Sequence, residues 1–249
     1  MAQIDRSFVG EGILYGRIYQ SADALTDLGN CDAFNLSFAT DRKTLPNYRG
    51  GGGNRNVLER VTDVTATVGM FDIVATNLAR VTKAVIAEVA AGVVTAEALS
   101  CKGVQGELIP FKNLPDLREP VTIVTAADAA LQPGTDYLLT AHGVIVTPGS
   151  LIDDTGIKAS YTRLKSSAVQ MLAGSQFELE LFIAGLNDAK SGEPFALRVH
   201  RAKFGLAKEV PMFGTDFMRL EAPVELLASD LVMASGISKF CQMDLVTGA

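Results

Sequence analysis

The chain has 249 residues, 48% of them apolar and 20% charged, and its formal net charge is −6. This composition excludes a disordered chain. It also argues against a general nucleic-acid binder, because that affinity comes from neutralising phosphates with lysine and arginine. No apolar run approaches the roughly 20 residues that cross a bilayer as a helix. Residues 1–10 carry no signal-peptide pattern, so we expect synthesis in a cytoplasm.

The first three strands are predicted over residues 12–20, 33–39 and 57–70. In the second and third, apolar residues alternate with polar ones, which is the period of a half-buried strand. Between these two strands, residues 40–56 contain a proline, four consecutive glycines and several cations without any periodicity. Such a segment predicts a long, flexible, exposed loop at the tip of a β-hairpin. We call residues 40–56 the hairpin arm.

One helix is predicted over residues 73–91. Five apolar residues repeat there at spacings of three and four and so share one face: Val74, Leu78, Val81, Val85 and Val89. Asp72 is a candidate N-cap, which extends the element to 72–91, and Gly92 is a candidate stop signal. The apolar stripe predicts contact with a core.

After the helix, short strands are predicted near residues 93–100 and 106–111, followed by a linker with two prolines at 113–120. Residues 121–162 alternate short strands with Gly, Pro and Asp turns, which predicts a small β insertion. Long alternating strands return at 175–185, 194–204 and 216–224.

These elements predict a mainly β, α+β fold: an antiparallel β-sandwich or partial barrel with one flanking α-helix and a small β insertion. The predicted boundaries divide the chain into a first part of the main domain at 1–118, an insertion at 119–162, and closing strands at 163–249.

Motifs for nucleophilic, metal or nucleotide chemistry are missing from the sequence. Cys31, Cys101 and Cys241 are far apart without a CxxC motif, which predicts buried reduced thiols. The only histidines, His142 and His200, lie in strand-like segments. The glycine run at 50–53 lies between two strands and lacks the lysine of a phosphate-binding loop.

Glu178 and Glu180 are neighbours on one face of a predicted strand. Paired carboxylates can hydrolyse glycosides, but no tryptophan or nearby tyrosine is present to stack on a sugar. The competing interpretation is a solvated strand face. We therefore expect no catalytic, metal-binding or cofactor-binding residue.

Three segments carry a family resemblance: FDIVATNLARVTKAV at 71–85, GTDYLLTAHGVIVTPGSLIDDTGIKASYT at 134–162, and LELFIAGLNDAKSGEPFALRVHRAKF at 179–204. Together with the order of the predicted elements, they make the chain resemble the major tail tube proteins of siphophages, which are long-tailed bacteriophages. The resemblance implies a structural, non-enzymatic subunit in the virion tail, made in the cytoplasm of the bacterial host.

The same resemblance implies partners. Subunits would form hexameric rings that stack around a lumen, and the lumen would conduct the genome during ejection. The partners are then other copies of the chain, the tape-measure protein, the tail-tip initiator and the tail terminator. Double-stranded DNA would pass without specific binding, and no membrane would be involved.

The resemblance also assigns roles to residues. The hairpin arm would join successive rings through its cations and its apolar side chains, so the expected ring-stacking residues are Arg42, Lys43, Leu45, Tyr48, Arg49 and Arg55. Polar and acidic strand faces would line the lumen and repel phosphate, which gives Asn35, Ser37, Glu59, Asp63, Thr65, Thr67, Gln176, Glu178 and Glu180. The alternatives are a disordered arm without function and an ordinary wet sheet face.

Three other classes stay open. The tube protein of a contractile tail or of a type VI secretion system is related, although the β insertion argues against it, since such tube proteins are usually shorter. A β-sandwich binding module, such as a phage adhesin or a carbohydrate-binding domain, would be expected to carry tryptophan, which is absent. An enzyme would need a convergent acid–base or nucleophile set, which the sequence does not contain.

Overall fold

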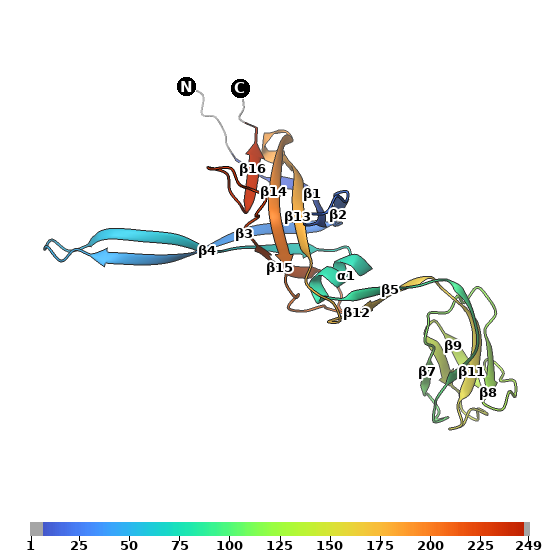
Figure 1. The fold of residues 1–249 in the computed structure, drawn as a ribbon. Coiled ribbons are helices and arrows are strands. Elements are labelled where there is room, and N and C mark those ends of the chain that lie inside the picture. The colour runs from blue at the N-terminus through green and yellow to red at the C-terminus, as the bar shows by residue number, and fades with distance from the viewer. Residues whose placement is uncertain (1–6, 247–249) are drawn as a thin grey trace. The chain divides into compact units, whose positions relative to one another are not determined.

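A computed structural model describes residues 7–246 of the chain (Figure 1). The chain divides into two compact units. The first joins the residues up to Ile86 to those from Val169 onward, and the second is Ala87–Ala168. Antiparallel strands build both units, and the described residues contain one α-helix and no closed barrel. The predicted mainly β, α+β fold is therefore confirmed.

The first unit contains an eight-stranded sheet with the order β2-β1-β13-β14-β15-β4-β3, in which β16 also pairs with β14 (Figure 1). A single 3-10 turn, Asp188–Lys190, connects β13 to β14. The strands are β1 Gly10–Ile18, β2 Thr26–Asp27, β3 Cys31–Pro46, β4 Asn54–Met70, β13 Glu178–Asn187, β14 Glu193–Phe204, β15 Leu220–Leu226 and β16 Cys241–Leu245.

Alternation along these strands creates the core of the first unit. In β15 the four residues at even positions are buried and those between them are exposed: Leu220, Ala222, Val224 and Leu226 face inward. Val68 of β4 and Phe204 of β14 are fully buried in the same core. Each apolar side chain buried in this way stabilises the fold by about 1.5–3 kcal/mol.

The helix is shorter than the sequence predicts. The structure has α1 at Ala75–Thr82, and Lys83 ends it in the left-handed conformation, with its backbone N–H donated to the carbonyl of Ala79. Residues Val85–Val89 form β5 instead, although their valines continue the helical spacing. A spacing of four is also an even number, so the same valines suit one side of a strand, and β-branched residues favour that state.

The predicted helix caps are also wrong. Val74 is the N-cap and forms no side-chain cap bond, while the Asp72 carboxylate accepts the backbone N–H of Asn30. Gly92 does not stop a helix but begins β6. The buried Asn77 amide donates to the carbonyls of Leu28 and Asp72 and so ties α1 to the preceding loops.

The second unit is a small β-sandwich. Two three-stranded sheets, with the orders β7-β10-β9 and β6-β11-β8, enclose one core that includes Ile109, Ile123 and Tyr161. The strands are β6 Gly92–Leu99, β7 Leu108–Pro110, β8 Thr122–Thr125, β9 Tyr137–Thr140, β10 Gly143–Val146 and β11 Ile157–Arg163.

The second unit is wider than the insertion predicted at 119–162. It begins at Ala87 and ends at Ala168, so β6 and β7 belong to it rather than to the main domain. The proline-containing linker at 113–120 lies inside this unit, where Pro115 bridges to Arg163. β6 pairs with β11 across about 60 residues of chain, and such a distant pairing leaves no local signal of a boundary. β5 pairs with β12, Ser166–Gln170, in a separate two-stranded sheet.

Candidate functional site

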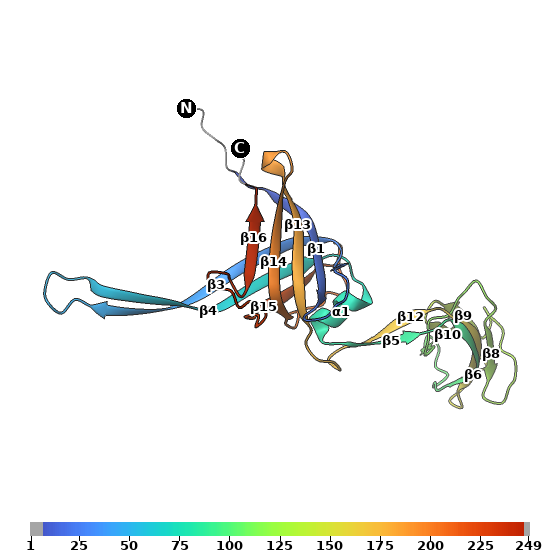
Figure 2. The ribbon, with the colours of Figure 1, turned by 45° about the horizontal axis from the view of Figure 1, so that its top comes forward.

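The outer halves of β3 and β4 form a hairpin that extends beyond the rest of their sheet (Figures 1 and 2). The two strands pair from Cys31 opposite Met70 out to Pro46 opposite Asn54. Every residue from Ser37 to Asp63 is exposed except Asn47, which is half-buried. Both faces of this ribbon therefore lack any covering layer.

The predicted flexible loop over residues 40–56 is corrected by this pairing. Strand structure continues to Pro46 and resumes at Asn54, so only residues 47–53 form the turn. Sequence periodicity does not reveal these strands. Apolar and polar residues alternate only where one face of a strand is buried, and this ribbon buries neither face. The four glycines, Gly50–Gly53, have φ values between 71° and 92°, a region that favours glycine.

The expected stacking residues lie along this exposed ribbon. Tyr48 is 84% exposed at the turn, and Leu45 is 49% exposed near the end of β3. The side chains of the arm's cations form no ion pair or hydrogen bond among the described residues: Arg42, Lys43, Arg49 and Arg55. Seven of the eight described arginines outside the arm do have a side-chain partner, and the exception, Arg60, lies on the same ribbon.

Six of the expected lumen residues lie together on one face of the sheet. Asn35 is paired with Thr67 and Ser37 with Thr65, both on the side that the core does not occupy. Gln176 lines a shallow groove of about 370 Å³ together with Thr65 and Thr67. Asp63 continues the same row opposite Ala39. The predicted polar face thus exists as a contiguous surface at these positions.

Glu59 lies elsewhere, contrary to the prediction. A β-bulge between Ala39 and Thr40 places one extra residue, Thr62, on β4, and a bulge reverses the alternation beyond it. Glu59 therefore falls on the side of Arg42, its paired residue, and accepts a hydrogen bond from the Thr40 hydroxyl at 2.9 Å. A count of alternate positions along the sequence cannot detect such an insertion.

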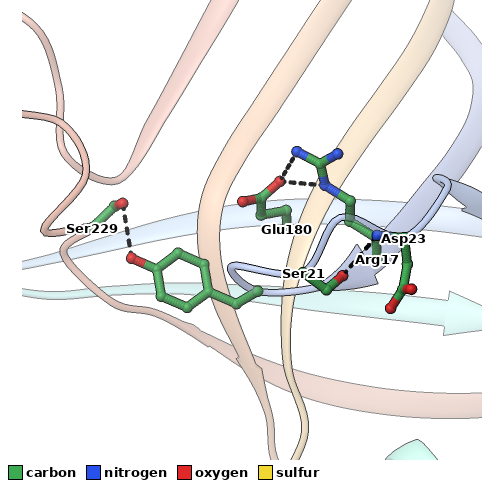
Figure 3. A network of polar contacts seen from close by, with 6 residues as sticks. Arg17, Ser21, Asp23, Glu180 and Ser229 are labelled. Atoms are coloured by element: carbon green, nitrogen blue, oxygen red, sulfur yellow. Dashed lines mark hydrogen bonds and ion pairs between the residues drawn. The ribbon is translucent and has the colours of Figure 1, made fainter.

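Glu178 and Glu180 carry ion pairs that the sequence did not indicate, and Figure 3 shows the pair of Glu180 with Arg17. The Arg17 guanidinium lies 2.5 Å from Glu180, and the Arg201 guanidinium lies 2.9 Å from Glu178. The hydrogen bond that Arg201 donates to the Glu178 carboxylate raises the pKa of Arg201. The charges of these two acids are therefore balanced, and the negative wall expected from them is corrected to a mixed-charge surface.

A second polar contact borders these pairs. The Tyr19 hydroxyl lies 3.1 Å from the Ser229 hydroxyl, and the Arg201 guanidinium lies over the Tyr19 ring at 5.1 Å from its centre. Figure 3 shows the Ser229 contact beside Arg17 and Glu180. These contacts join β1, β13, β14 and the loop after β15. Their role is therefore to stabilise this part of the sheet and not to activate a side chain.

An open groove of about 590 Å³ lies where β1, β3, β14 and β16 meet. Its lining includes the apolar side chains of Phe34, Phe195, Leu197 and Met243, and the carboxylate-bearing residues Glu11 and Asp32 are part of it. We call it the apolar groove. The sequence did not predict it, because its walls come from strands that are distant along the chain.

The comparison with protein families covers nearly all of these features. A family model described as "Protein of unknown function UCP028589" matches residues 7–244. The chain belongs to this family. The match includes the hairpin arm, the polar face, the apolar groove and the whole second unit. No curated protein matches the chain.

The cysteines of this UCP028589 member are all free thiols in the described residues. Burial and the nearby carboxylates of Asp27, Asp32 and Asp72 raise the pKa of Cys31 to about 11, which keeps that thiol protonated and unreactive. Within residues 7–246, no three Cys, His, Asp or Glu side chains gather in a way that could hold a metal ion. No described helix is long and apolar enough to cross a membrane.

Proposed function

We propose that this chain is the tail tube subunit of a siphophage, a structural protein that assembles into hexameric rings stacked around a lumen. Its partners are then other copies of itself, the tape-measure protein, the tail-tip initiator and the tail terminator. Its place is the virion tail. The observation that carries the proposal is the hairpin ribbon, whose two faces are exposed from Ser37 to Asp63 apart from Asn47.

An isolated two-stranded hairpin is marginally stable in water, because it buries little apolar area against a large loss of chain entropy. A folded protein that builds such a ribbon needs something to cover it. The apolar side chains along the ribbon support a covering partner: Phe38 is 62% exposed and Val61 is 59% exposed. In a stacked tube that partner is the next ring.

The sheet edges support assembly as well. Among the strands of residues 7–246, β3 pairs only with β4, so its second edge presents backbone groups that none of these strands pairs. Edges of this kind add further strands readily, and closure of a barrel across several subunits removes them.

The polar face suits a lumen that DNA crosses without sticking. Asn35, Ser37, Thr65 and Thr67 carry no charge, and the two glutamates beyond them are balanced by arginines. A surface without excess positive charge releases few counterions on contact with DNA and so gives little affinity.

Negative-stain electron microscopy of the concentrated protein tests the proposal. We expect rings with six-fold symmetry or hollow tubes, together with large species in analytical ultracentrifugation. A protein that remains monomeric up to its solubility limit would contradict self-assembly. Binding to a glycan array by such a monomer would favour the binding-module interpretation.

A further inference from the structure

The hairpin arm carries four cations and one acidic residue, Asp41, whereas the whole chain has a net charge of −6. None of the four cations forms an ion pair among the described residues, although Glu59 lies opposite Arg42 in the strand register. Most other arginines of the structure have partners, so the arm differs from the rest of the surface in presenting unpaired positive charge. Such a surface is complementary to an acidic one. A second copy of the chain supplies the negative charge, because the chain outside the arm is acidic.

The apolar groove has the matching chemistry. Its floor exposes aromatic and aliphatic side chains, among them Phe34 and Phe195, and Met243 is 46% exposed there. Asp32 is already bound to Arg219 at 2.8 Å, but Glu11 forms no ion pair among the described residues. Cys31 also lines the groove, and burial together with the nearby carboxylates of Asp27, Asp32 and Asp72 raises the pKa of its thiol.

The geometry points to an intermolecular contact: we propose that the apolar groove of one copy holds the turn of another copy's hairpin arm, with Tyr48 on the apolar floor and Arg49 beside Glu11. This rests on the proposed function, since it names the surface that receives the arm. The four glycines next to Tyr48 allow the backbone to approach closely, because they carry no side chain.

The arm cannot fill its own groove. About twelve residues of paired strand separate the groove-lining part of β3 from Tyr48, which is about 40 Å at the usual rise per residue. The ribbon is hydrogen-bonded along this length and does not fold back. A contact between two different surfaces of the same chain is heterologous, so it propagates from copy to copy.

Cysteine cross-linking of the full-length chain tests the contact. One copy carries Asn54→Cys, an exposed position that keeps Tyr48, Arg49 and the positive-φ glycines of the turn. The other carries Met243→Cys in the groove. We expect an intermolecular disulfide after oxidation of the mixture. The matched control is Gln242→Cys, the adjacent exposed residue on β16 whose side chain points to the opposite face. Wild-type copies mixed with Asn54→Cys report any background from native cysteines.

Charge reversal adds a second readout. Arg49→Glu should lower the yield of cross-linked dimer about two- to fivefold, and Glu11→Arg in the partner should restore it, as the strength of exposed ion pairs predicts. Tyr48→Ala should lower the yield further than Arg49→Glu.

The outcomes separate the two ideas. Cross-linking at residue 243 but not at 242 supports the groove. Equal cross-linking at both positions, or at neither while the wild-type protein forms tubes, overturns the groove and leaves the proposed function standing. Failure of both cross-linking and tube formation contradicts both. Retention of double-stranded DNA that is lost in Arg49→Glu would assign the cations to nucleic acid and overturn the groove.

Discussion

Arg17 and Glu180 face each other across β1 and β13, with the arginine Nε and Nη2 atoms 2.6 Å and 2.5 Å from the same glutamate oxygen. Both nitrogens thus bind one atom, and the pair joins two neighbouring strands of the sheet. An ion pair with partly exposed side chains stabilises a fold by about 1 kcal/mol or less. Glu180 is therefore a structural partner of Arg17 rather than a free charge on the sheet face.

A double-mutant cycle measures that role. We expect Arg17→Ala and Glu180→Gln to be coupled by about 0.5–1 kcal/mol in the free energy of unfolding, determined by urea denaturation. Glu225→Gln is the matched control, because Glu225 is an exposed acid of the same sheet without a described ion pair. Its coupling to Arg17→Ala should stay within about 0.3 kcal/mol of zero. Equal coupling in the two cycles would show that Arg17 and Glu180 do not interact specifically.

Deletion of Tyr48–Asn54 should leave a folded and soluble subunit that cannot stack. None of the deleted residues is buried, so the melting temperature measured by circular dichroism should change little. Electron microscopy should then show no long tubes. Tyr48→Phe keeps the aromatic ring and serves as the control that still assembles. Long tubes from the deletion variant would refute the stacking role of the arm.

Gly185 is needed because the Phe195 ring occupies the space where a β-carbon would stand. We expect Gly185→Ala to lower the free energy of unfolding by about 1–3 kcal/mol through overpacking. Gly214→Ala is the control, since its β-carbon would meet no atom closer than 4.0 Å and should change stability by less than about 0.5 kcal/mol. Phe195→Leu combined with Gly185→Ala should recover part of the loss, and a neutral Gly185→Ala variant would contradict the packing argument.

Cys31 should resist alkylation in the folded protein. Its pKa of about 11 compares with 9.0 for an unperturbed thiol, and the thiolate is the reactive form. Two pKa units lower the thiolate fraction at pH 8 about 100-fold, so iodoacetamide should modify Cys31 about 100-fold more slowly in the folded protein than in urea. Peptide mass spectrometry after timed quenching gives the two rates, and similar rates would contradict the raised pKa.

The same shift has a consequence for stability. A raised pKa means that the folded state holds the proton more tightly than the unfolded state. The contribution of Cys31 is therefore complete below about pH 9 and is lost as the pH rises to about 11. Cys31→Ser should remove this part of the alkaline loss of stability, measured as the change in urea midpoint between pH 8 and pH 11.

The sequence by itself determined the elements whose side chains alternate between a core and water. The strands at 175–185 and 194–204 were predicted within a few residues, because one face of each is buried and apolar residues alternate with polar ones along it. The strand predicted at 33–39 is the inner part of β3, where the same alternation holds. The polar face of Asn35, Ser37, Thr65 and Thr67 follows from the same rule. A mainly β chain with a long hairpin is the part of the fold that local patterns specify.

Only the tertiary structure decided the features that depend on distant pairings. The valines of residues 85–89 fit either a helix or a strand, and pairing with β12 selects the strand. Glu59 changes sides because of a bulge, and Glu180 loses its free charge to Arg17, 163 residues away along the chain. The second unit extends to Ala87 because β6 pairs with β11. Hydrogen-bond register and ion pairing between remote strands leave no periodic trace in a sequence, so the fold alone reveals them.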